Sequence, residues 1–443
     1  RTRQTPKDFL IMRKLLALLI YRVTLPCLFI AAFPAWIFKM LRRGGLGTPL
    51  SERIAIYSTD AEMEPCGAIH IHAISVGETL IALKLIREWL TQHPQQRFVL
   101  ATGTATGHTV ASDAKIAQVR VAYSPLDFPS MVTRYLNRFE PSGIVLIEGE
   151  LWPHLLLACR NRSIPISLVN ARMSPRSSCR YRRFAKWLRP FVSCLDAVAI
   201  QEAEDESIWR ELGVAADAIH LTGSIKFDPG SGTAPARRQA FQDMLDAFGH
   251  ARSVVLAAST HAGEDAWIAN AIRDAAPHAL PVIAPRHAER RDSATRDLEA
   301  AAFTVNARSQ FDASHRPDES SAVFLIDTTG ELGEWTALAD VVIIGKSFFS
   351  KGGQNPAEAI LARRPVIFGP HMENFEPLAT RLVAADACIQ AISHAQLVDA
   401  IRRAIDPHEA QQLTTRASHI LSAHQGATQR VIGMLTAGSG VSN

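Results

Sequence analysis

The sequence has few cysteines and little excess charge. Its 443 residues include six cysteines, and none of them forms a CxxC or CxH pair. This count and spacing exclude a disulfide framework and argue against a zinc site, so a reducing compartment is expected. The 47 Lys and Arg residues exceed the 43 Asp and Glu residues by a net charge of +4. That excess is too small for wholesale nucleic-acid binding, and no nucleic-acid partner is expected.

Two common phosphate-binding motifs are also missing. No GxGxxG follows the first apolar run of either half, and no GxxxxGK[ST] occurs. These absences remove the main support for a dinucleotide-dependent dehydrogenase and for a P-loop NTPase. By contrast, 47% of the residues are hydrophobic, which is enough for a large core and excludes global disorder. At about 150 residues per domain, the length predicts two or three domains.

A long apolar segment, residues 15–38, lies near the N-terminus. One charge, Arg22, interrupts it, and basic residues flank both ends. About 20 apolar residues span a bilayer, so we expect an uncleaved membrane anchor that spans the membrane or lies in one leaflet. A signal peptide and a buried core helix are the alternatives. The basic residues in 39–43 predict that the downstream bulk stays in the cytoplasm, and residues 1–11, ahead of Met12, are interpreted as a tag or upstream extension.

Short runs rich in Val and Ile alternate with amphipathic stretches beyond residue 65. The first series of runs is 68–75, 98–102, 119–123, 143–147, 165–169 and 197–201, and the second is 253–258, 280–284, 323–326, 341–345 and 365–368. Buried parallel strands separated by helices produce this pattern. The sequence therefore predicts an α/β fold with two Rossmann-like parallel-sheet domains.

The stretch 223–236 between the two series is turn-rich and predicts a linker. The predicted organisation is a leader and anchor at 1–43, a first domain at 44–222, and a second domain at 237–443 with terminal helices. Whether one terminal helix crosses back to the first domain is left open. Ligands of such sheets bind beyond the carboxyl ends of strands, so the cleft between the domains is the expected active site.

Three carboxylates follow predicted strands of the first domain. Glu78 opens a helix after the first strand, whereas Glu148 and Glu150 follow the fourth strand, ahead of a helix that begins with Pro153. Glu78 is either a partner of the helix dipole or a general base at the mouth of the cleft. Glu148 or Glu150 can accept hydrogen bonds from a sugar or orient a basic group; helix capping alone is the alternative.

Seven basic side chains and no acid occur between Arg172 and Arg189, with Phe184 and Trp187 among them. A charge run of this kind is often only a solvated helix face. Arginines among aromatic residues also suit phosphate groups at a membrane surface. RNA is a minor alternative because the total charge is near neutral.

The second domain carries residues typical of a nucleotide site. Arg286 follows a predicted strand directly and can fork onto a phosphate. The glycines Gly352 and Gly353 precede Asn355, which opens a predicted helix whose N-terminus can face a phosphate. Glu358, one turn further, can accept both hydroxyls of a ribose. A capped helix after a glycine loop is the alternative.

Taken together, these segments resemble the 3-deoxy-D-manno-octulosonic acid (Kdo) transferases of lipopolysaccharide synthesis, from the anchor to about residue 375. The resemblance rests on the shared order and spacing of ten motifs: 72–78, 148–153, 170–174, 223–228, 258–264, 285–287, 327–332, 352–358, 369–371 and 374–375. The sequence departs from the family pattern at Gln354, where His is common, at Gly149, where Thr is common, and at Pro175, where an acid is common. Because Gln still donates a hydrogen bond, donor binding is expected to survive.

The resemblance implies a GT-B glycosyltransferase that moves Kdo from CMP-Kdo to the lipid A precursor lipid IVA, with inversion and without a metal or other cofactor. It implies that Glu78 is the base. The implied donor-binding residues are Arg286, His287, Glu331, Ser347, Gly352, Gly353, Gln354, Asn355 and Glu358, and the implied acceptor- or sugar-binding residues are Glu150, Arg172 and Lys226.

The anchor and the basic run imply a membrane lipid surface as partner. The implied location is the cytoplasmic face of the inner membrane of a Gram-negative bacterium. Two other interpretations stay open: a GT-B transferase that uses a UDP-sugar on another lipid acceptor, and a membrane-tethered nucleotide-sugar binder without activity.

Overall fold

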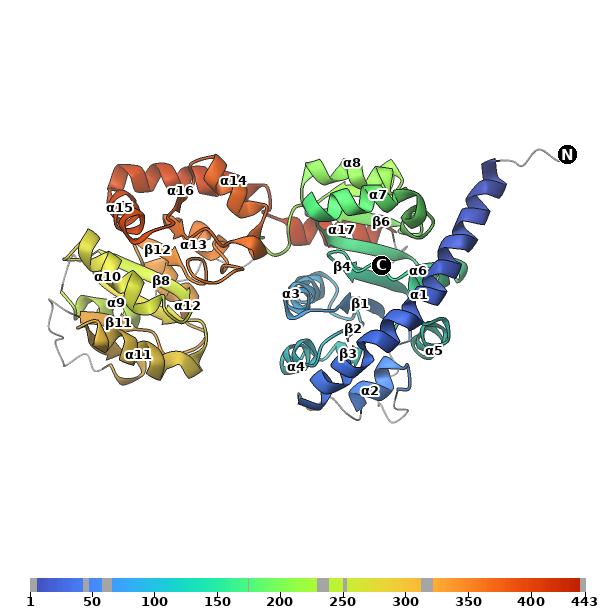
Figure 1. Cartoon of the computed structure of the whole chain (residues 1–443), viewed down its shortest axis with the longest axis horizontal. Helices are drawn as coiled ribbons and strands as arrows, with labels where there is room; N and C mark the ends of the chain where they lie inside the picture. The colour runs from blue at the N-terminus through green and yellow to red at the C-terminus, as the bar shows by residue number, and fades with distance from the viewer. Residues whose placement is uncertain are drawn as a thin grey trace. The chain divides into compact units, whose positions relative to one another are not determined.

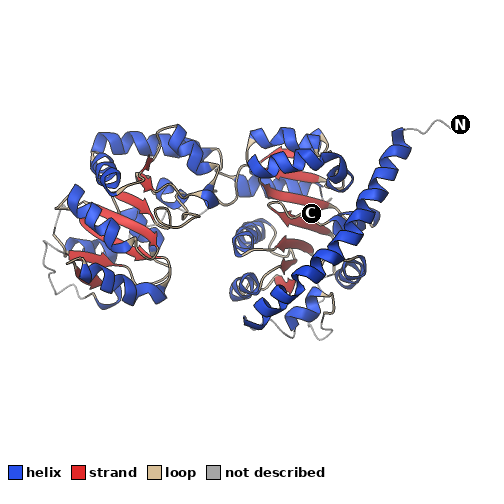
Figure 2. Ribbon diagram, viewed as in Figure 1, coloured by secondary structure: helices blue, strands red, loops and turns tan. Residues whose placement is uncertain are grey.

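The structure is a computed structural model that describes residues 6–42, 48–57, 66–173, 175–228, 239–249, 253–311 and 322–438. It divides into two compact units. Unit 1 comprises Arg1–Gly230 and His424–Asn443, and unit 2 comprises Ser231–Ala423. Each unit is a parallel sheet with helices on its faces (Figures 1 and 2). The predicted α/β class, with two parallel-sheet domains and an N-terminal apolar helix, is confirmed.

Unit 1 has a seven-stranded sheet of order β3-β2-β1-β4-β5-β6-β7. Its strands are β1 Ile69–Ala73, β2 Phe98–Thr102, β3 Val119–Tyr123, β4 Gly143–Ile147, β5 Ile166–Ala171, β6 Ala197–Ile200 and β7 Ile219–Leu221. Its helices are α1 Pro6–Arg42, α2 Thr48–Arg53, α3 Val76–Gln92, α4 Ala105–Asp113, α5 Pro129–Phe139, α6 Pro153–Asn161, α7 Pro175–Val192, α8 Glu206–Glu211 and α17 Ala427–Gly438, with 3₁₀ turns η1 Ala203–Asp205 and η2 Ala216–Ala218. Every residue of β1 and β2 is buried, which explains their unbroken apolar runs.

Unit 2 has a second parallel sheet, of order β10-β11-β9-β8-β12-β13-β14. Its strands are β8 Val254–Thr260, β9 Leu280–Pro285, β10 Thr304–Ala307, β11 Ala322–Leu325, β12 Val341–Ile344, β13 Val366–Phe368 and β14 Ile389–Gln390. Its helices are α9 Gln239–Asp246, α10 Asp265–Ala275, α11 Arg291–Ala300, α12 Leu332–Leu338, α13 Ala357–Leu361, α14 Leu378–Ala384, α15 His394–Ile405 and α16 Pro407–Ser422, with η3 Ala288–Arg290, η4 Arg308–Gln310 and η5 Glu373–Phe375.

Each sheet has a point at which the strand order reverses. In unit 1 it lies between β1 and β4, and in unit 2 between β8 and β12. Loops that leave two such strands diverge, and ligands of open α/β sheets bind in the crevice between them. These two points are where functional side chains are expected.

Helix α17 belongs to unit 1, although the sequence places residues 237–443 in the second domain. It packs against α3 and β6 (Figure 1). Its residues Val431 and Ile432 are fully buried in one core cluster with Trp89. The apolar stripe of α17 could pack on either domain, so the sequence alone does not assign the helix to one of them. The assignment follows from the contacts of α17 in the fold.

The start of the predicted linker 223–236 also belongs to unit 1. Residues 223–228 are buried except for Lys226, which is half-buried. Lys84 Nζ donates to the Ile225 carbonyl at 2.9 Å and fixes this segment against α3. Residues 229–238 lie outside the described part of the chain.

Candidate active site

Three carboxylates meet at the strand-order reversal of unit 1. β1 and β4 are paired neighbours, with His72 opposite Leu146, so their carboxyl ends lie side by side. Glu78 follows β1, and Glu148 and Glu150 follow β4. Burial raises the pKa of Glu78 and of Glu150, and the charge of Glu148 adds to both shifts, as the charge of Glu78 adds to that of Glu150, so the three carboxylates lie close together.

Glu78 is both a helix cap and a candidate base. Ser75 Oγ donates to its Oε1 at 2.8 Å, and the Ile74 N–H donates to its Oε2 at 2.8 Å. This is a capping-box arrangement at the start of α3. Burial raises the pKa of Glu78, while the hydrogen bonds from Ile74 and Ser75 oppose that shift. Each carboxylate oxygen has two lone-pair sites, so each can still accept a substrate hydroxyl.

Glu150 has a strongly raised pKa. Burial raises its pKa from 4.5 to about 7, with further contributions from Glu78 and Glu148. Near neutral pH the group is therefore partly protonated and can donate as well as accept a hydrogen bond. Burial and the charge of Glu150 also raise the pKa of Tyr181 on α7, which places that phenol near the cluster.

Two cations balance the carboxylates. Burial lowers the pKa of Lys226, Glu148 raises it, and Arg172, directly after β5, lowers it. The structure thus brings together Lys226, Arg172 and the three carboxylates within unit 1. Glu148 adopts a φ of 61°, in the left-handed region that non-glycine residues rarely occupy. Such backbone strain is concentrated at functional sites.

Neighbouring side chains fix the loop that carries Lys226. Asn170 Oδ1, at the end of β5, accepts the Ile225 N–H at 2.9 Å. Asp228 accepts the backbone N–H groups of Gly426 and Thr428 at 2.9 and 2.7 Å. In the sequence, Asn170 and Asp228 stand out only as members of the motifs 170–174 and 223–228. Their structural roles could not be predicted, because their hydrogen-bond partners are far away along the chain.

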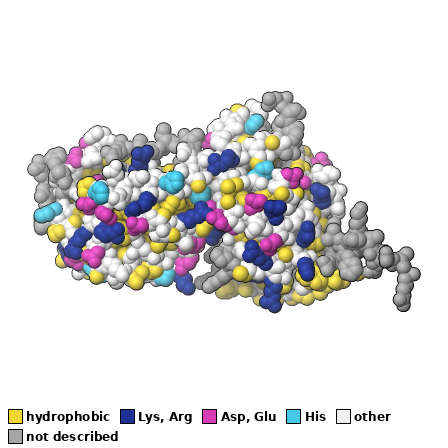
Figure 3. All heavy atoms as spheres, turned by 90° about the horizontal axis from the view of Figure 1, so that it is seen from above, with side chains coloured by type: hydrophobic (Ala, Val, Ile, Leu, Met, Phe, Trp, Pro, Cys, Tyr) yellow, Lys and Arg dark blue, Asp and Glu magenta, His cyan; other side chains and the backbone are white. Residues whose placement is uncertain are grey.

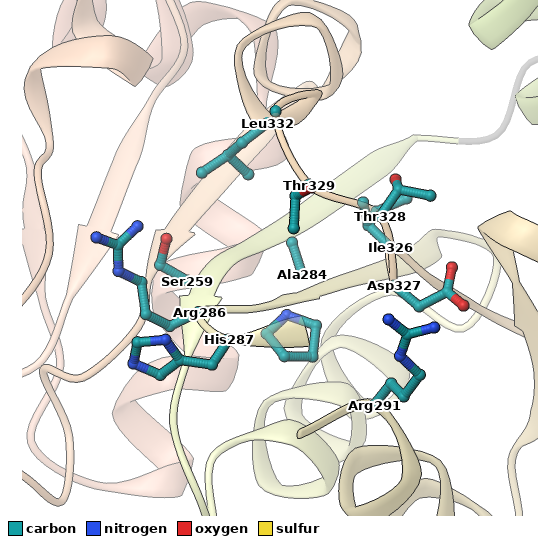
Figure 4. Close-up of a pocket in the computed structure, with 12 residues that line it drawn as sticks. Ser259, Ala284, Arg286, His287, Arg291, Ile326, Asp327, Thr328, Thr329 and Leu332 are labelled. Carbon is teal, nitrogen blue, oxygen red and sulfur yellow. The ribbon is translucent and has the colours of Figure 1, made fainter. Parts of the chain in front are cut away.

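Unit 2 has a pocket of about 180 Å³ at the carboxyl ends of β8, β9 and β11. Arg286 and His287 lie on one side of it, and Arg291 and Asp327 lie on the other (Figure 4). The predicted residues Arg286 and His287 therefore line a real cavity. Asp327, Thr328 and Thr329 also line it; they fall in the motif 327–332 that carries the resemblance, although only Glu331 of that motif was predicted as a site residue. Arg291, at the start of α11, was not singled out from the sequence.

Glu358 lies within electrostatic reach of Arg286. Burial raises the pKa of Glu358, and the Arg286 guanidinium opposes that rise.

Glu331 contacts Arg308 at 3.3 Å and accepts the Thr328 hydroxyl at 2.7 Å. Ser347 is fully buried: its hydroxyl donates to the Ile344 carbonyl at 2.6 Å and accepts the Gly369 N–H at 2.8 Å. Glu331 and Ser347 thus have structural contacts in unit 2, and their donor-binding roles stay predictions.

The glycine loop has internal partners. The Gly352 N–H donates to Glu373 Oε2 at 2.7 Å, and the Gly353 N–H donates to the Lys346 carbonyl at 3.0 Å. Asn355 Oδ1 accepts the Ala357 N–H at 3.1 Å, at the start of α13, which is only five residues long and has Pro356 as its N-cap. Gln354 is half-buried in the same loop. A phosphate at this loop would have to replace the Glu373 carboxylate on Gly352.

Close backbone packing holds the reversal point of unit 2. A Cβ on Gly345 would lie 2.4 Å from the Ser259 carbonyl oxygen, so only glycine fits there. The buried Glu264 accepts the N–H groups of Lys346 at 2.7 Å and His261 at 2.9 Å, and so joins the loops after β12 and β8. In the described part of the chain, no group of three or more His, Cys, Asp or Glu residues is placed to hold a metal ion.

Comparison with known proteins gives matches along most of the chain. Residues 48–229 match the family model described as 3-Deoxy-D-manno-octulosonic-acid transferase (kdotransferase). A 3-deoxy-D-manno-octulosonic acid transferase of Bordetella pertussis is 34% identical over 418 residues, which cover 90% of this chain and 94% of that protein. One of Haemophilus influenzae is 30% identical over 394 residues, covering 87% and 90%.

Solved structures give a further comparison, of the fold alone. A putative UDP-N-acetylglucosamine 2-epimerase from Listeria monocytogenes matches with a TM-score of 0.55 at 12% identity. The match covers 85% of this chain and 98% of that one. The likeness agrees with a GT-B-like fold.

Proposed function

Because the chain belongs to the family of 3-deoxy-D-manno-octulosonic acid transferases, and is thus a glycosyltransferase, we propose that it transfers Kdo from CMP-Kdo to the lipid A precursor lipid IVA. The observation that carries this mechanism is the buried, hydrogen-bonded Glu78 carboxylate at the end of β1, beside Glu148 and Glu150. The proposed location is the cytoplasmic face of the inner membrane of a Gram-negative bacterium.

Glu78 acts as the base in this proposal. The acceptor hydroxyl gives its proton to a Glu78 oxygen while its own oxygen forms a bond to the anomeric carbon of Kdo. The bond from that carbon to the CMP phosphate breaks, and CMP leaves with the electron pair, so the anomeric centre inverts. Burial makes Glu78 more basic than an ordinary carboxylate, and Ser75 and Ile74 hold it in one orientation.

The neighbouring charged groups hold the sugars. Lys226 and Arg172 offer positive charge to the carboxylate of Kdo or to the phosphates of the acceptor. Glu150, with a pKa of about 7, can donate a hydrogen bond to a sugar oxygen or accept one from a hydroxyl. We assign these residues to sugar binding and not to proton transfer.

Unit 2 binds CMP in this proposal. Arg286 stabilises the phosphate as negative charge develops on it, and the nearby Glu358 accepts the ribose hydroxyls. His287 and the hydroxyls of Thr328 and Thr329 line the same pocket. CMP is a good leaving group, so the proposal needs no acid on the donor and no metal or cofactor.

The test is transfer from freshly generated CMP-Kdo to tetraacylated lipid A precursor, followed by mass spectrometry, with EDTA in a parallel reaction. The expected product is heavier by one or more Kdo units in both reactions. Loss of product with EDTA would contradict the metal-free mechanism. Competition by UDP instead of CMP would favour a UDP-sugar donor, and CMP binding without turnover on any acceptor would favour a binding protein.

A further inference from the structure

Helix α1 is held along the surface of unit 1. Ala17 is buried, and Tyr21, Leu25, Phe29 and Ile37 are half-buried, while Phe33, in the same register, is 41% exposed. Residues four apart lie on one face of a helix, so these positions form a stripe turned toward the rest of the unit. The stripe runs through most of the segment 15–35, which is long and apolar enough to cross a membrane.

Specific contacts fix the stripe. Tyr21 Oη donates to Asp127 Oδ2 at 2.9 Å, and its ring lies 5.0 Å from the His154 ring. Phe29 meets Phe128 edge to face at 5.7 Å. Asp127 is buried, and its carboxylate also accepts the His154 N–H at 2.9 Å. The helix is therefore tied to the start of α6 and to the loop before α5, both parts of the globular unit (Figure 1).

The length of the stripe conflicts with a membrane span. Ala17 to Ile37 covers about 30 Å of helix at 1.5 Å per residue, which is about the thickness of the hydrocarbon core. The segment that would cross the bilayer is thus the segment that contacts unit 1. A spanning helix would break the Tyr21–Asp127 hydrogen bond or draw the Asp127 carboxylate into hydrocarbon, and both are costly.

The other side of α1 suits lipid. Leu16, Leu19, Val23 and Ile30 are exposed, Ile30 by 70%. Helix α7 packs against α1 and exposes two aromatic residues, Phe184 and Trp187, and the basic residues Arg183 and Lys186. On the face of unit 1 that Figure 3 shows, hydrophobic side chains gather along the lower edge, with basic and acidic side chains beside them. Apolar and aromatic residues beside cations are typical of helices that lie in the plane of an anionic membrane surface.

We propose that α1 lies flat in one leaflet, docked on unit 1, and does not cross the bilayer. The exposed face of α1 contacts the acyl chains of an anionic lipid leaflet. The basic residues of α7 contact the lipid headgroups. This attachment does not depend on which sugar the enzyme transfers.

Two labelling experiments on the full-length protein in inverted inner-membrane vesicles test the proposal, with the exposed cysteines Cys27, Cys66 and Cys179 replaced by Ser. The first uses Lys7→Cys, with the exposed Asp217→Cys as reference. We expect an impermeant maleimide to label both equally in intact vesicles. Labelling of Lys7→Cys only after detergent is added would mean that α1 crosses the bilayer, and would overturn the proposal.

The second experiment asks whether the docking persists in the membrane. A short bis-maleimide is expected to cross-link Phe29→Cys with Phe128→Cys. The matched control is Leu28→Cys with Phe128→Cys, which should not cross-link because Leu28 is 67% exposed. Failure of the first pair, or equal cross-linking of both, would overturn docking on unit 1. Transfer activity is measured separately, so failure of this proposal and failure of the proposed function are distinguishable.

Discussion

The Asp228 carboxylate accepts the backbone N–H of Thr428 at 2.7 Å, across 200 residues of sequence. Its other oxygen accepts the Gly426 N–H at 2.9 Å, so Asp228 caps α17. Lys226 lies two residues earlier in the same buried segment. The position of a proposed sugar-binding cation is thus coupled to a helix from the other end of the chain.

Replacing Asp228 with Ala is expected to destabilise unit 1 by about 2–3 kcal/mol, since hydrogen bonds to a charged group contribute about that much. Turnover should fall as well, because Lys226 loses its support. Urea unfolding measures the first effect and product formation the second. Asp217→Ala, at an exposed position, is the control. Unfolding of the Asp228 variant at the wild-type midpoint would show that the cap carries no stability.

Glu78→Gln is expected to lower kcat by about 100- to 10,000-fold, because the amide cannot take the acceptor proton. CMP affinity should change less than about twofold, since Glu78 is proposed to contact the acceptor hydroxyl and not CMP, and Gln keeps the size of the side chain. Calorimetric titration with CMP and a transfer assay give the two values. Glu206→Gln, an exposed carboxyl on α8, should behave as wild type. Full activity in Glu78→Gln would disprove the base assignment.

The raised pKa of Glu150 predicts a pH effect on stability. The folded protein holds this proton more tightly than the unfolded chain, with a pKa of about 7 against 4.5. The stabilising contribution is therefore complete below pH 4.5 and is lost as the pH rises through about 7. Glu150→Gln should remove this loss and gain stability relative to wild type at alkaline pH. Urea midpoints at a series of pH values test it; parallel curves for the two proteins would refute the shift.

Arg286→Ala is expected to weaken CMP binding by about 10- to 100-fold, as loss of a charge-assisted hydrogen bond does. Arg296→Ala is the matched control, because Arg296 is exposed and its guanidinium donates within α11, to the Asp292 carbonyl at 3.1 Å. Calorimetry with CMP measures both variants. Equal affinities would remove Arg286 from the donor site.

Two glycine substitutions should have opposite effects. A Cβ on Gly345 would lie 2.4 Å from the Ser259 carbonyl, so Gly345→Ala should destabilise unit 2 by about 2 kcal/mol or more. Gly433, in α17, has no atom within 4 Å of the same test position, so Gly433→Ala should stabilise unit 1 by about 0.5–1 kcal/mol. Denaturant unfolding measures both, and a destabilised Gly433→Ala would contradict the packing described for α17.

The central strands were predictable from sequence because burial on both faces leaves an apolar run. The run 98–102 coincides with β2, and the run 143–147 with β4. The strands β7, β10 and β14 gave no such run. Each has four residues or fewer and is partly exposed at or near a sheet edge, so little apolar sequence is needed to form it.

The place of the candidate site residues in the fold was predictable from their position after a strand, as for Glu78, Glu150 and Arg286. Their roles stay predictions. The internal partners of Ser347 and Gly352 were not predictable, because Gly369 and Glu373 lie about twenty residues away and meet them only in the fold. The same holds for the pKa of Glu150, which depends on burial and on charges from another loop.

The return of α17 to unit 1 has a consequence for synthesis of the protein. The ribosome makes all of unit 2 before it makes α17, so nascent unit 1 waits with the α3 face around Trp89 uncovered. Unit 2 is a single continuous stretch of the chain, Ser231–Ala423. It can therefore fold while unit 1 is still incomplete. Chains that end prematurely after unit 2 would therefore expose apolar surface on the other unit, where a holdase chaperone or a protease would recognise them.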